Sequence, residues 1–495
     1  MTAYSKLETR FARLAAVGEA TSVLHWDMAA MMPAGGAGAR AEQLAALKRV
    51  QHDMMADPAL SDLLDAAEGE GGLDDWQRAN LREMRREWLH ATALNGALVE
   101  AIAKTCAASE MAWRAARPAS DFPAVRPHLE AVLALVRESA QAKAAHLQCA
   151  PYDALLDEYE PGGRATEIEP VFRAYAAFLP DFLARVLERQ SAGGPALALD
   201  GPFPVAAQKA LAREFMAALG FDFSHGRLDE SHHPFCGGVP EDVRITTRYD
   251  EADFSRGLMG VLHETGHALY ERNLPSRWRR QPVGRARGMS AHESQSLLVE
   301  MQACRGRAFF EYAAPRIRAA FGREGPAWSA DNLHRRYTRV AAGFIRVDAD
   351  EVTYPAHVIL RTRLERAMIA GDLAVADLPG AWNAGMKALL GIVPPDDRRG
   401  CLQDIHWYDG AWGYFPTYTL GAMTAAQLFQ AACRTEPAIP HRIAVGDFAP
   451  LVVWLAREVH GRASLLDTRA LLVAATGRAL DPGLFEAHLT ARYLS

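Results

Sequence analysis

Two histidines, His263 and His267, stand four residues apart, and Glu264 directly follows the first of them. On a helix, positions i and i+4 lie one above the other on the same face, so both imidazoles can reach one metal ion. Zinc binds histidine nitrogen at about 2.0–2.1 Å, a reach that this spacing satisfies. A glutamate beside the first ligand can take a proton from a metal-activated water. The pattern therefore predicts a hydrolytic metal site.

The alternative is a chance occurrence of the same pattern on a solvated helix. The chain has 17 His and 60 acidic residues among 495. From these frequencies, we expect roughly a few hundredths of an H-E-x-x-H per chain. The metal site is the better interpretation.

A third ligand must come from elsewhere in the chain. Metzincins place it at position 273 with a glycine at 270, but this sequence has Asn273 and Tyr270, which excludes that class. Glu271 continues the same helical stripe. It lies about 12 Å along the axis from His263, at 1.5 Å per residue, which is too far for one ion.

The next predicted helix, 288–302, offers two candidates, Glu293 and Glu300. They lie about 10 Å apart by the same rise, so only one of them can bind the ion. Glu293 has a second interpretation, because Ser290 stands three residues before it in the pattern of a helix capping box. Spacing alone leaves the choice open.

Helices must position these residues, because helical periodicity dominates the chain. One strand is predicted at 242–249, which is rich in β-branched residues and lies just before the histidine-bearing helix. Gly266 inside that helix costs about 1 kcal/mol relative to alanine, which suggests that another backbone or a substrate approaches there. The clearest helical stretches are 40–55, 76–109, 126–147, 167–190 and 205–219.

Composition excludes several classes of protein. A net charge of −6 gives no general reason to bind nucleic acid or an anionic membrane. We find no signal peptide and no uncharged apolar segment of about 18 residues, so we expect neither export nor a membrane. The six cysteines form no C-x-x-C pair, which indicates reduced thiols and a cytoplasmic protein.

Further motifs accompany the histidine pair, in a fixed order along the chain. Together they resemble the carboxypeptidase Taq family of zinc metallocarboxypeptidases. One departure is Met28, where the family often has glutamine. The motifs are HPF (233–235), DVRIT (242–246), HETGH (263–267), HES (292–294), IRVDAD (345–350) and GCLQDIHW (400–407), with further matches at 25–45, 152–162 and 413–423.

This resemblance implies a ligand set and a fold. The zinc ligands would be His263, His267 and Glu293 rather than Glu300. The fold would be mainly α, a large helical bundle with a deep active-site groove and a small β-sheet beside the metal, similar in outline to neurolysin and angiotensin-converting enzyme. We expect one domain over 1–495, with a helical N-terminal part to about residue 200 and a metal-site part after it, and the resemblance implies a homodimer.

Residues outside the metal site would complete the catalytic machinery. An oxyanion needs a donor besides the metal, and His406, Tyr414 and Tyr418 are the candidates in the C-terminal motifs. Either tyrosine could equally be a core aromatic with a satisfied hydroxyl. The family motif includes His406, which favours it.

Cleavage only at a C-terminus requires a group that binds a free carboxylate, and a guanidinium does so with paired hydrogen bonds. The resemblance nominates Arg346 first and Arg244 second. Asp350 would orient that arginine, or it forms a plain structural ion pair. His233 would contact substrate or support the wall of the site.

We therefore expect a metallocarboxypeptidase of broad specificity that acts on peptides, with one zinc ion per chain that cobalt can replace. Glu264 would be the general base. Two alternatives remain open: a zinc oligo-endopeptidase with the same metal site, and a non-catalytic peptide-binding scaffold.

Overall fold

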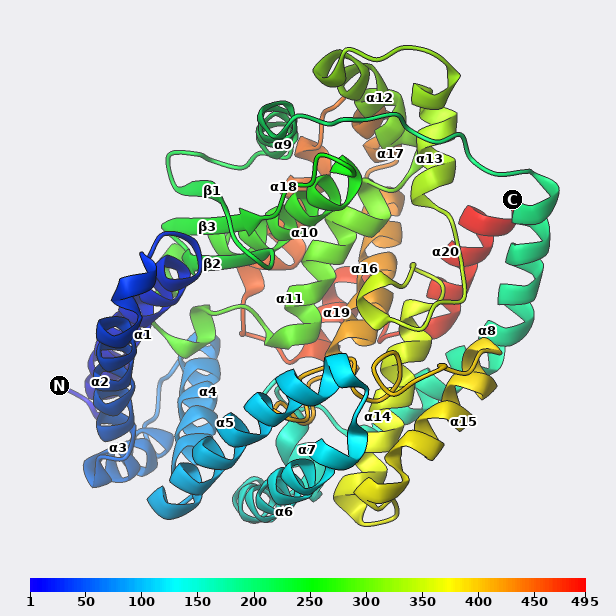
Figure 1. The fold of residues 1–495 in the computed structure, drawn as a ribbon. Coiled ribbons are helices and arrows are strands. Elements are labelled where there is room, and N and C mark those ends of the chain that lie inside the picture. The colour runs from blue at the N-terminus through cyan, green and yellow to red at the C-terminus, as the bar shows by residue number, and fades with distance from the viewer.

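A computed structural model describes residues 1–495 as twenty α-helices and one small sheet, which lies at one side of the molecule between α1 and α10 (Figure 1). This confirms the mainly α fold with a small sheet. No helix is long and apolar enough to cross a membrane. The helices are α1 (Ala3–Ala30), α2 (Ala37–Met55), α3 (Pro58–Glu68), α4 (Asp75–Thr92), α5 (Gly96–Ala119), α6 (Phe122–Leu147), α7 (Pro151–Leu156), α8 (Ala165–Ala192), α9 (Val205–Ala218), α10 (Phe254–Arg272), α11 (Gly288–Leu297), α12 (Arg307–Phe321), α13 (Ala330–Tyr337), α14 (Tyr354–Ala370), α15 (Leu378–Leu390), α16 (Pro416–Thr435), α17 (Ile439–Ala444), α18 (Ala449–Glu458), α19 (Thr468–Thr476) and α20 (Pro482–Leu494).

The predicted helical stretches all lie in helices, but 76–109 is divided between α4 and α5. The helix α4 begins at a capping box in which Asp74 and Gln77 each bond the other's backbone N–H. Asn95 then starts α5, because its side chain accepts from the backbone N–H of Leu98. Side-chain caps of this kind satisfy backbone donors that a helix start leaves free.

The sheet has three strands in the order β1-β3-β2, with β1 (Gly226–Glu230) parallel and β2 (Phe235–Val239) antiparallel to β3 (Asp242–Thr247). The central strand β3 is the one that its β-branched residues predicted. Its Ile245 is buried against Val261 of α10 in a small apolar cluster. The sheet therefore lies directly on the helix that carries the histidines.

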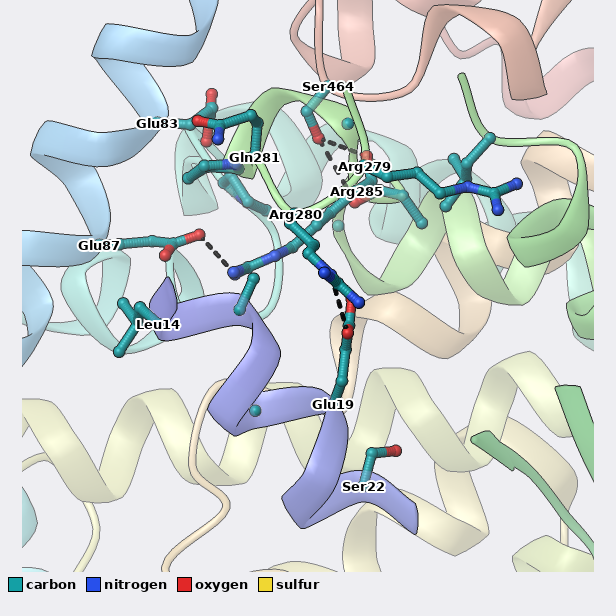
Figure 2. Close-up of a pocket in the computed structure, with 18 of the residues that line it drawn as sticks. Leu14, Glu19, Ser22, Glu83, Glu87, Arg279, Arg280, Gln281, Arg285 and Ser464 are labelled. Carbon is teal, nitrogen blue, oxygen red and sulfur yellow. Dashed lines mark hydrogen bonds and ion pairs between the residues drawn. The ribbon is translucent and has the colours of Figure 1, made fainter. Parts of the chain in front are cut away.

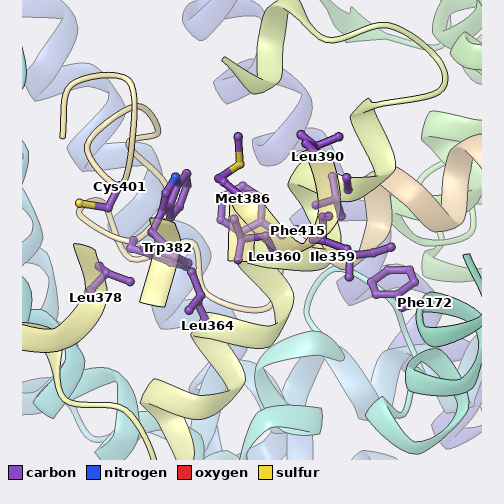
Figure 3. Close-up of a cluster of buried hydrophobic side chains, with 14 of the residues drawn as sticks. Phe172, Ile359, Leu360, Leu364, Leu378, Trp382, Met386, Leu390, Cys401 and Phe415 are labelled. Atoms are coloured by element: carbon purple, nitrogen blue, oxygen red, sulfur yellow. The ribbon is translucent and has the colours of Figure 1, made fainter. Parts of the chain in front are cut away.

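Two large apolar cores hold the helices together. One contains 43 buried residues and joins residues 116–186 to residues 340–493, so that Phe172 and Trp382 belong to the same cluster (Figure 3). The other contains 38 buried residues and surrounds α10 and α12. A smaller third cluster lies between α1, α3 and α4.

The helix α11 is pressed between α10 and α16 at two glycines. A Cβ on Gly266 of α10 would lie 2.4 Å from the carbonyl oxygen of Gln295, and a Cβ on Gly421 of α16 would lie 2.9 Å from the Cβ of Glu293. No larger residue fits either position without moving a helix. The close backbone approach expected at Gly266 is therefore made by α11, and it sets where Glu293 stands.

Candidate metal centre and active site

Three side chains from α10 and α11 converge on one point. The Nε2 atom of His267 lies 3.4 Å from Oε2 of Glu293, and the Nε2 atom of His263 lies 3.7 Å from the same oxygen. All three ligand atoms lie within 4.8 Å of one another. Ligands bound tetrahedrally at about 2.0–2.1 Å stand roughly 3.4 Å apart, so these donors have the spacing of a metal site.

The capping box proposed for Glu293 is not formed. The helix α11 starts after Arg287, without a side-chain cap, and the backbone N–H of Ser290 donates to Glu160 at 3.2 Å. Glu293 is instead turned toward the two histidines, and the hydroxyl of Ser296 donates to it at 3.2 Å.

Glu300 holds His263 from behind. It lies in the π-helical turn η4 (Leu298–Ala303), and its Oε2 accepts a hydrogen bond of 3.0 Å from Nδ1 of His263. Its Oε1 accepts from Arg305 at 2.6 Å. With Nδ1 donating to Glu300, Nε2 is the nitrogen that remains for a metal ion, and it is the one that faces Glu293.

A longer relay orients His267. Nε2 of His292 donates to Glu271 at 2.8 Å, which leaves Nδ1 of His292 to accept from Nδ1 of His267 at 2.7 Å. Glu271 is too far along the helix to be a ligand, and it orients His267 through His292 instead. Both histidine ligands have their free nitrogen directed at the same point by an outer carboxylate.

Glu264 is buried on the same helix, and burial raises the pKa of its carboxyl to about 7. A base with a pKa close to neutral accepts a proton readily and can return it. The charges of His263 and Glu293 both act on this carboxyl, and the motif predicts that it lies beside the metal ion.

A second polar cluster surrounds Arg346, in the 3₁₀ turn η6 (Arg346–Asp348). Nε and Nη2 of Arg346 donate to Oδ1 of Asp404 at 3.0 and 2.8 Å, and Nη1 donates to the hydroxyl of Tyr354 at 3.0 Å. The guanidinium also stacks 5.1 Å from the ring centroid of Tyr418. Three of its five N–H bonds are used, which leaves two for a ligand.

His406, Tyr414 and Tyr418 stand together beside this arginine. Nε2 of His406 lies 3.3 Å from the Tyr418 hydroxyl, and the two tyrosine rings are 5.0 Å apart. Burial lowers the pKa of His406 to about 4, so the imidazole is neutral. Burial and the charge of Glu293 raise the pKa of Tyr414 to about 12, which keeps the phenol protonated.

The remaining predicted residues lie outside these two clusters. Arg244 on β3 binds Asp242 through Nε at 3.0 Å and stacks 4.2 Å from the ring of Trp26. His233 is exposed in the loop before β2. Asp350 accepts from the backbone N–H groups of its own loop, including Val352 at 3.0 Å, and does not bind Arg346. Neither of the roles expected for Asp350 describes this contact.

A groove of about 980 Å³ lies between the N-terminal helices and the loop after α10 (Figure 2). The helices α1 and α4 and the loop after α10 form its walls, and its lining includes His292 and Glu271, the two residues behind His267. Two ion pairs join the walls: Arg280 with Glu19 at 3.0 Å and Arg285 with Glu87 at 2.7 Å.

Comparison with known proteins decides the family. The model of the carboxypeptidase Taq (M32) metallopeptidases matches residues 6–493. The chain belongs to this family. Thermostable carboxypeptidase 1 of Thermus thermophilus is 39% identical over 480 residues, covering 94% of each chain, and carboxypeptidase 1 of Bacillus subtilis is 32% identical over 97% of this chain and 96% of its own.

Solved M32 structures have the same fold. Metallocarboxypeptidase 1 of Trypanosoma cruzi superposes with a TM-score of 0.98 at 41% identity, covering 100% of this chain and 99% of its own. The M32 carboxypeptidase of Deinococcus radiodurans superposes with a TM-score of 0.94 at 34% identity, covering 99% and 98%. The chain is therefore a metallocarboxypeptidase by family, and a divalent metal ion is implied. Two histidine nitrogens and a carboxylate oxygen at the metal point are a donor set that suits such an ion.

Sequence reasoning did not single out Asp404, Tyr354 or the part that Glu271 and His292 play behind His267. Asp404 had a signal, because it stands inside the GCLQDIHW motif. No spacing or residue pattern marks Tyr354, which reaches Arg346 only through the fold.

Proposed function

We propose that this protein is a zinc carboxypeptidase that removes residues one at a time from the C-terminus of peptides, with broad specificity. Two observations support the proposal: His263, His267 and Glu293 converge on one point, and Arg346 is a buried arginine with two unused N–H bonds. The three converging residues could hold a metal ion for hydrolysis, and the arginine could bind a free carboxylate.

His263, His267 and Glu293 would hold the ion, and cobalt should replace zinc because the ligands are nitrogen and oxygen donors. When bound, zinc would supply Lewis acidity and lower the pKa of a coordinated water toward about 7. Glu264 takes the proton from the attacking water and passes it to the departing amine. Its pKa near neutrality suits both transfers.

The oxyanion that forms on the scissile carbonyl needs a neutral hydrogen-bond donor. His406 and Tyr418 share a hydrogen bond, and Tyr414 packs beside them. A phenol whose pKa is raised keeps its proton at neutral pH and can donate it into the site. We assign this role to the cluster of three, with His406 as its first member.

Arg346 would bind the terminal carboxylate of the substrate. Its position is held by Asp404 and Tyr354, so the guanidinium loses little freedom on binding. Arg244 remains the second candidate for this contact. His233 and Asp350 would support the wall and the loop rather than touch the carboxylate.

Product analysis on one peptide tests the reaction. Mass spectrometry of an unblocked peptide should show a ladder that shortens from the C-terminus, and a chelator should abolish it. Internal fragments, together with cleavage of an amidated peptide, would indicate an endopeptidase. Absence of turnover in metal-loaded protein would indicate a binding scaffold.

A variant of Arg346 tests how the C-terminal carboxylate of the substrate is recognised. Arg346→Ala should keep its metal but lose most of its kcat/KM on free-acid peptides, while cleavage of the amidated peptides changes little. Lysine at this position should recover only part of the loss, because it lacks the planar fork. An unchanged ratio of free-acid to amide cleavage would remove Arg346 from the role and make Arg244 the next candidate.

We further propose a single-domain homodimer in the cytoplasm. The 43-residue core that joins residues 116–186 to residues 340–493 supports one domain, and six cysteines without a disulfide suit a reducing compartment. The family resemblance alone supports the dimer. Sedimentation and a calorimetric unfolding curve with one transition are the tests.

A further inference from the structure

A second arginine binds Asp404 behind Arg346. Arg361, on α14, donates through Nε to Oδ2 of Asp404 at 2.6 Å, while Arg346 occupies Oδ1 of the same carboxylate. The Arg361 side chain is wholly buried, and those of Arg346 and Asp404 are 7% and 12% exposed. One carboxylate thus serves two guanidinium groups in the interior, and Arg361 cannot touch a substrate.

Three titratable neighbours of this triad, His357, His406 and Tyr354, add no charge to it. His357 and His406 are kept neutral, because burial lowers their pKa values to about 3 and about 4. Tyr354 is kept protonated, because burial raises its pKa to about 12. Two positive charges and one negative charge leave the triad with a net charge of +1.

An uncompensated buried charge is costly, and a one-to-one pair of Arg346 with Asp404 would avoid that cost. Stability therefore does not explain why Arg361 is present. A substrate carboxylate bound by Arg346 would complete two opposite pairs. The missing negative charge is the one that the terminus of a peptide brings.

We propose that Arg361 is a positioning residue for carboxylate recognition: by sharing Asp404 it prevents this aspartate from neutralising Arg346, and so leaves one positive charge in the wall for the C-terminus of the substrate. This inference rests on the proposed role of Arg346. It assigns the selectivity for a free terminus to a residue that lies behind the binding surface.

The test is the ratio of free-acid to amide cleavage in Arg361→Met, a variant that removes the charge and keeps most of the volume. The ratio should fall on the order of tenfold, the effect of one unit charge roughly 10 Å away at an effective dielectric constant of about 20. KM for free-acid peptides should rise while kcat changes little, because the charge attracts substrate and transition state alike.

A double variant separates charge from shape. Adding Asp404→Asn to Arg361→Met restores the net charge to +1 and retains an oxygen that can accept from Arg346. The double variant should recover most of the lost ratio. Failure to recover it, or a wild-type ratio in Arg361→Met, would overturn the proposal.

Arg366→Met is the matched control, because Arg366 lies on the same helix and pairs with Glu169 at 2.6 Å on the surface. It should leave the ratio unchanged. Thermal unfolding and metal content show whether each variant is folded. Should Arg361→Met not fold, Arg361→Lys takes its place: a retained ratio supports the role of charge, and a lost ratio contradicts it.

The Arg346→Ala experiment keeps the two hypotheses apart. An unchanged ratio in Arg346→Ala would refute the proposed role of Arg346 in binding the carboxylate, and with it the inference about Arg361. A collapsed ratio in Arg346→Ala, combined with a wild-type ratio in Arg361→Met, would refute only the inference about Arg361.

Discussion

Glu300→Gln should weaken metal binding although Glu300 is not one of the three converging ligands. Its two oxygens accept from His263 at 3.0 Å and from Arg305 at 2.6 Å. A glutamine amide has the same shape but only one acceptor oxygen. If this oxygen accepts from His263, the amide nitrogen faces Arg305, so one of the two contacts must be lost.

The size of the effect follows from what such outer partners do elsewhere. Loss of a carboxylate that orients a histidine ligand typically costs 10- to 100-fold in metal affinity, and we expect about that loss here. The loss should depend on pH. Burial lowers the pKa of metal-free His263, but Glu293 and then Glu300 outweigh this and raise it to about 10, so protons compete with the metal below that pH.

Removal of Glu300 lowers the pKa of His263 and therefore weakens this competition by protons. The affinity of the wild type should fall as the pH drops, and that of the variant should fall less. The difference between the two proteins should accordingly be largest in alkaline solution and narrow toward about pH 6.

Competition with a chromophoric chelator measures the affinity for zinc and for cobalt at each pH. Glu311→Gln is the control, since Glu311 makes only an exposed pair with Arg307, at 3.5 Å on α12. Equal affinities of Glu300→Gln and wild type across this pH range would refute the outer role of Glu300. Complete loss of metal would instead indicate that Glu300 is a direct ligand.

Three further predictions concern the general base, the packing of α10 against α11, and the pH dependence of stability. Glu264→Gln should keep its metal while kcat/KM falls by roughly 10² to 10⁴, and metal analysis beside turnover checks this, because loss of the metal would make Glu264 a ligand. Gly266→Ala should lower the free energy of unfolding by about 1–3 kcal/mol in denaturant titrations and weaken metal binding, because its Cβ would meet the Gln295 carbonyl at 2.4 Å. The control Gly380→Ala, in open space on α15, should not destabilise the protein, and equal stabilities of the two variants would contradict the close packing. Asp157→Asn should make the free energy of unfolding depend less on pH below about pH 4. Hydrogen bonds and charges around Asp157 outweigh burial and lower its pKa from 3.8 to about 2, so its carboxylate contributes about 2 kcal/mol of stability that is present above about pH 4 and lost as the pH falls toward 2. An unchanged slope of stability against pH in the variant would refute this.

Local periodicity was enough to bring part of the site together. His263, Glu264 and His267 lie within five residues, and the geometry of one helix determines how their side chains are related. The same reasoning predicts the strand at β3 and the main helical stretches, because apolar spacing and β-branched residues act over a few positions. It missed β1 and β2, whose glycines and charged residues pair only because β3 lies between them.

Contacts between distant segments could not be obtained in this way. Spacing alone could not decide whether Glu293 or Glu300 is the third ligand. The packing of α11 against Gly421 turns Glu293 toward the Nε2 atoms of the two histidines and leaves Glu300 behind His263. Asp350 is the acid of the same motif that we expected to pair with Arg346, yet the partner is Asp404, 58 residues away. Sequence proximity does not determine which side chains meet. The partner of Arg346 depends on how α14 and α16 pack with the loop between α15 and α16, which carries Asp404.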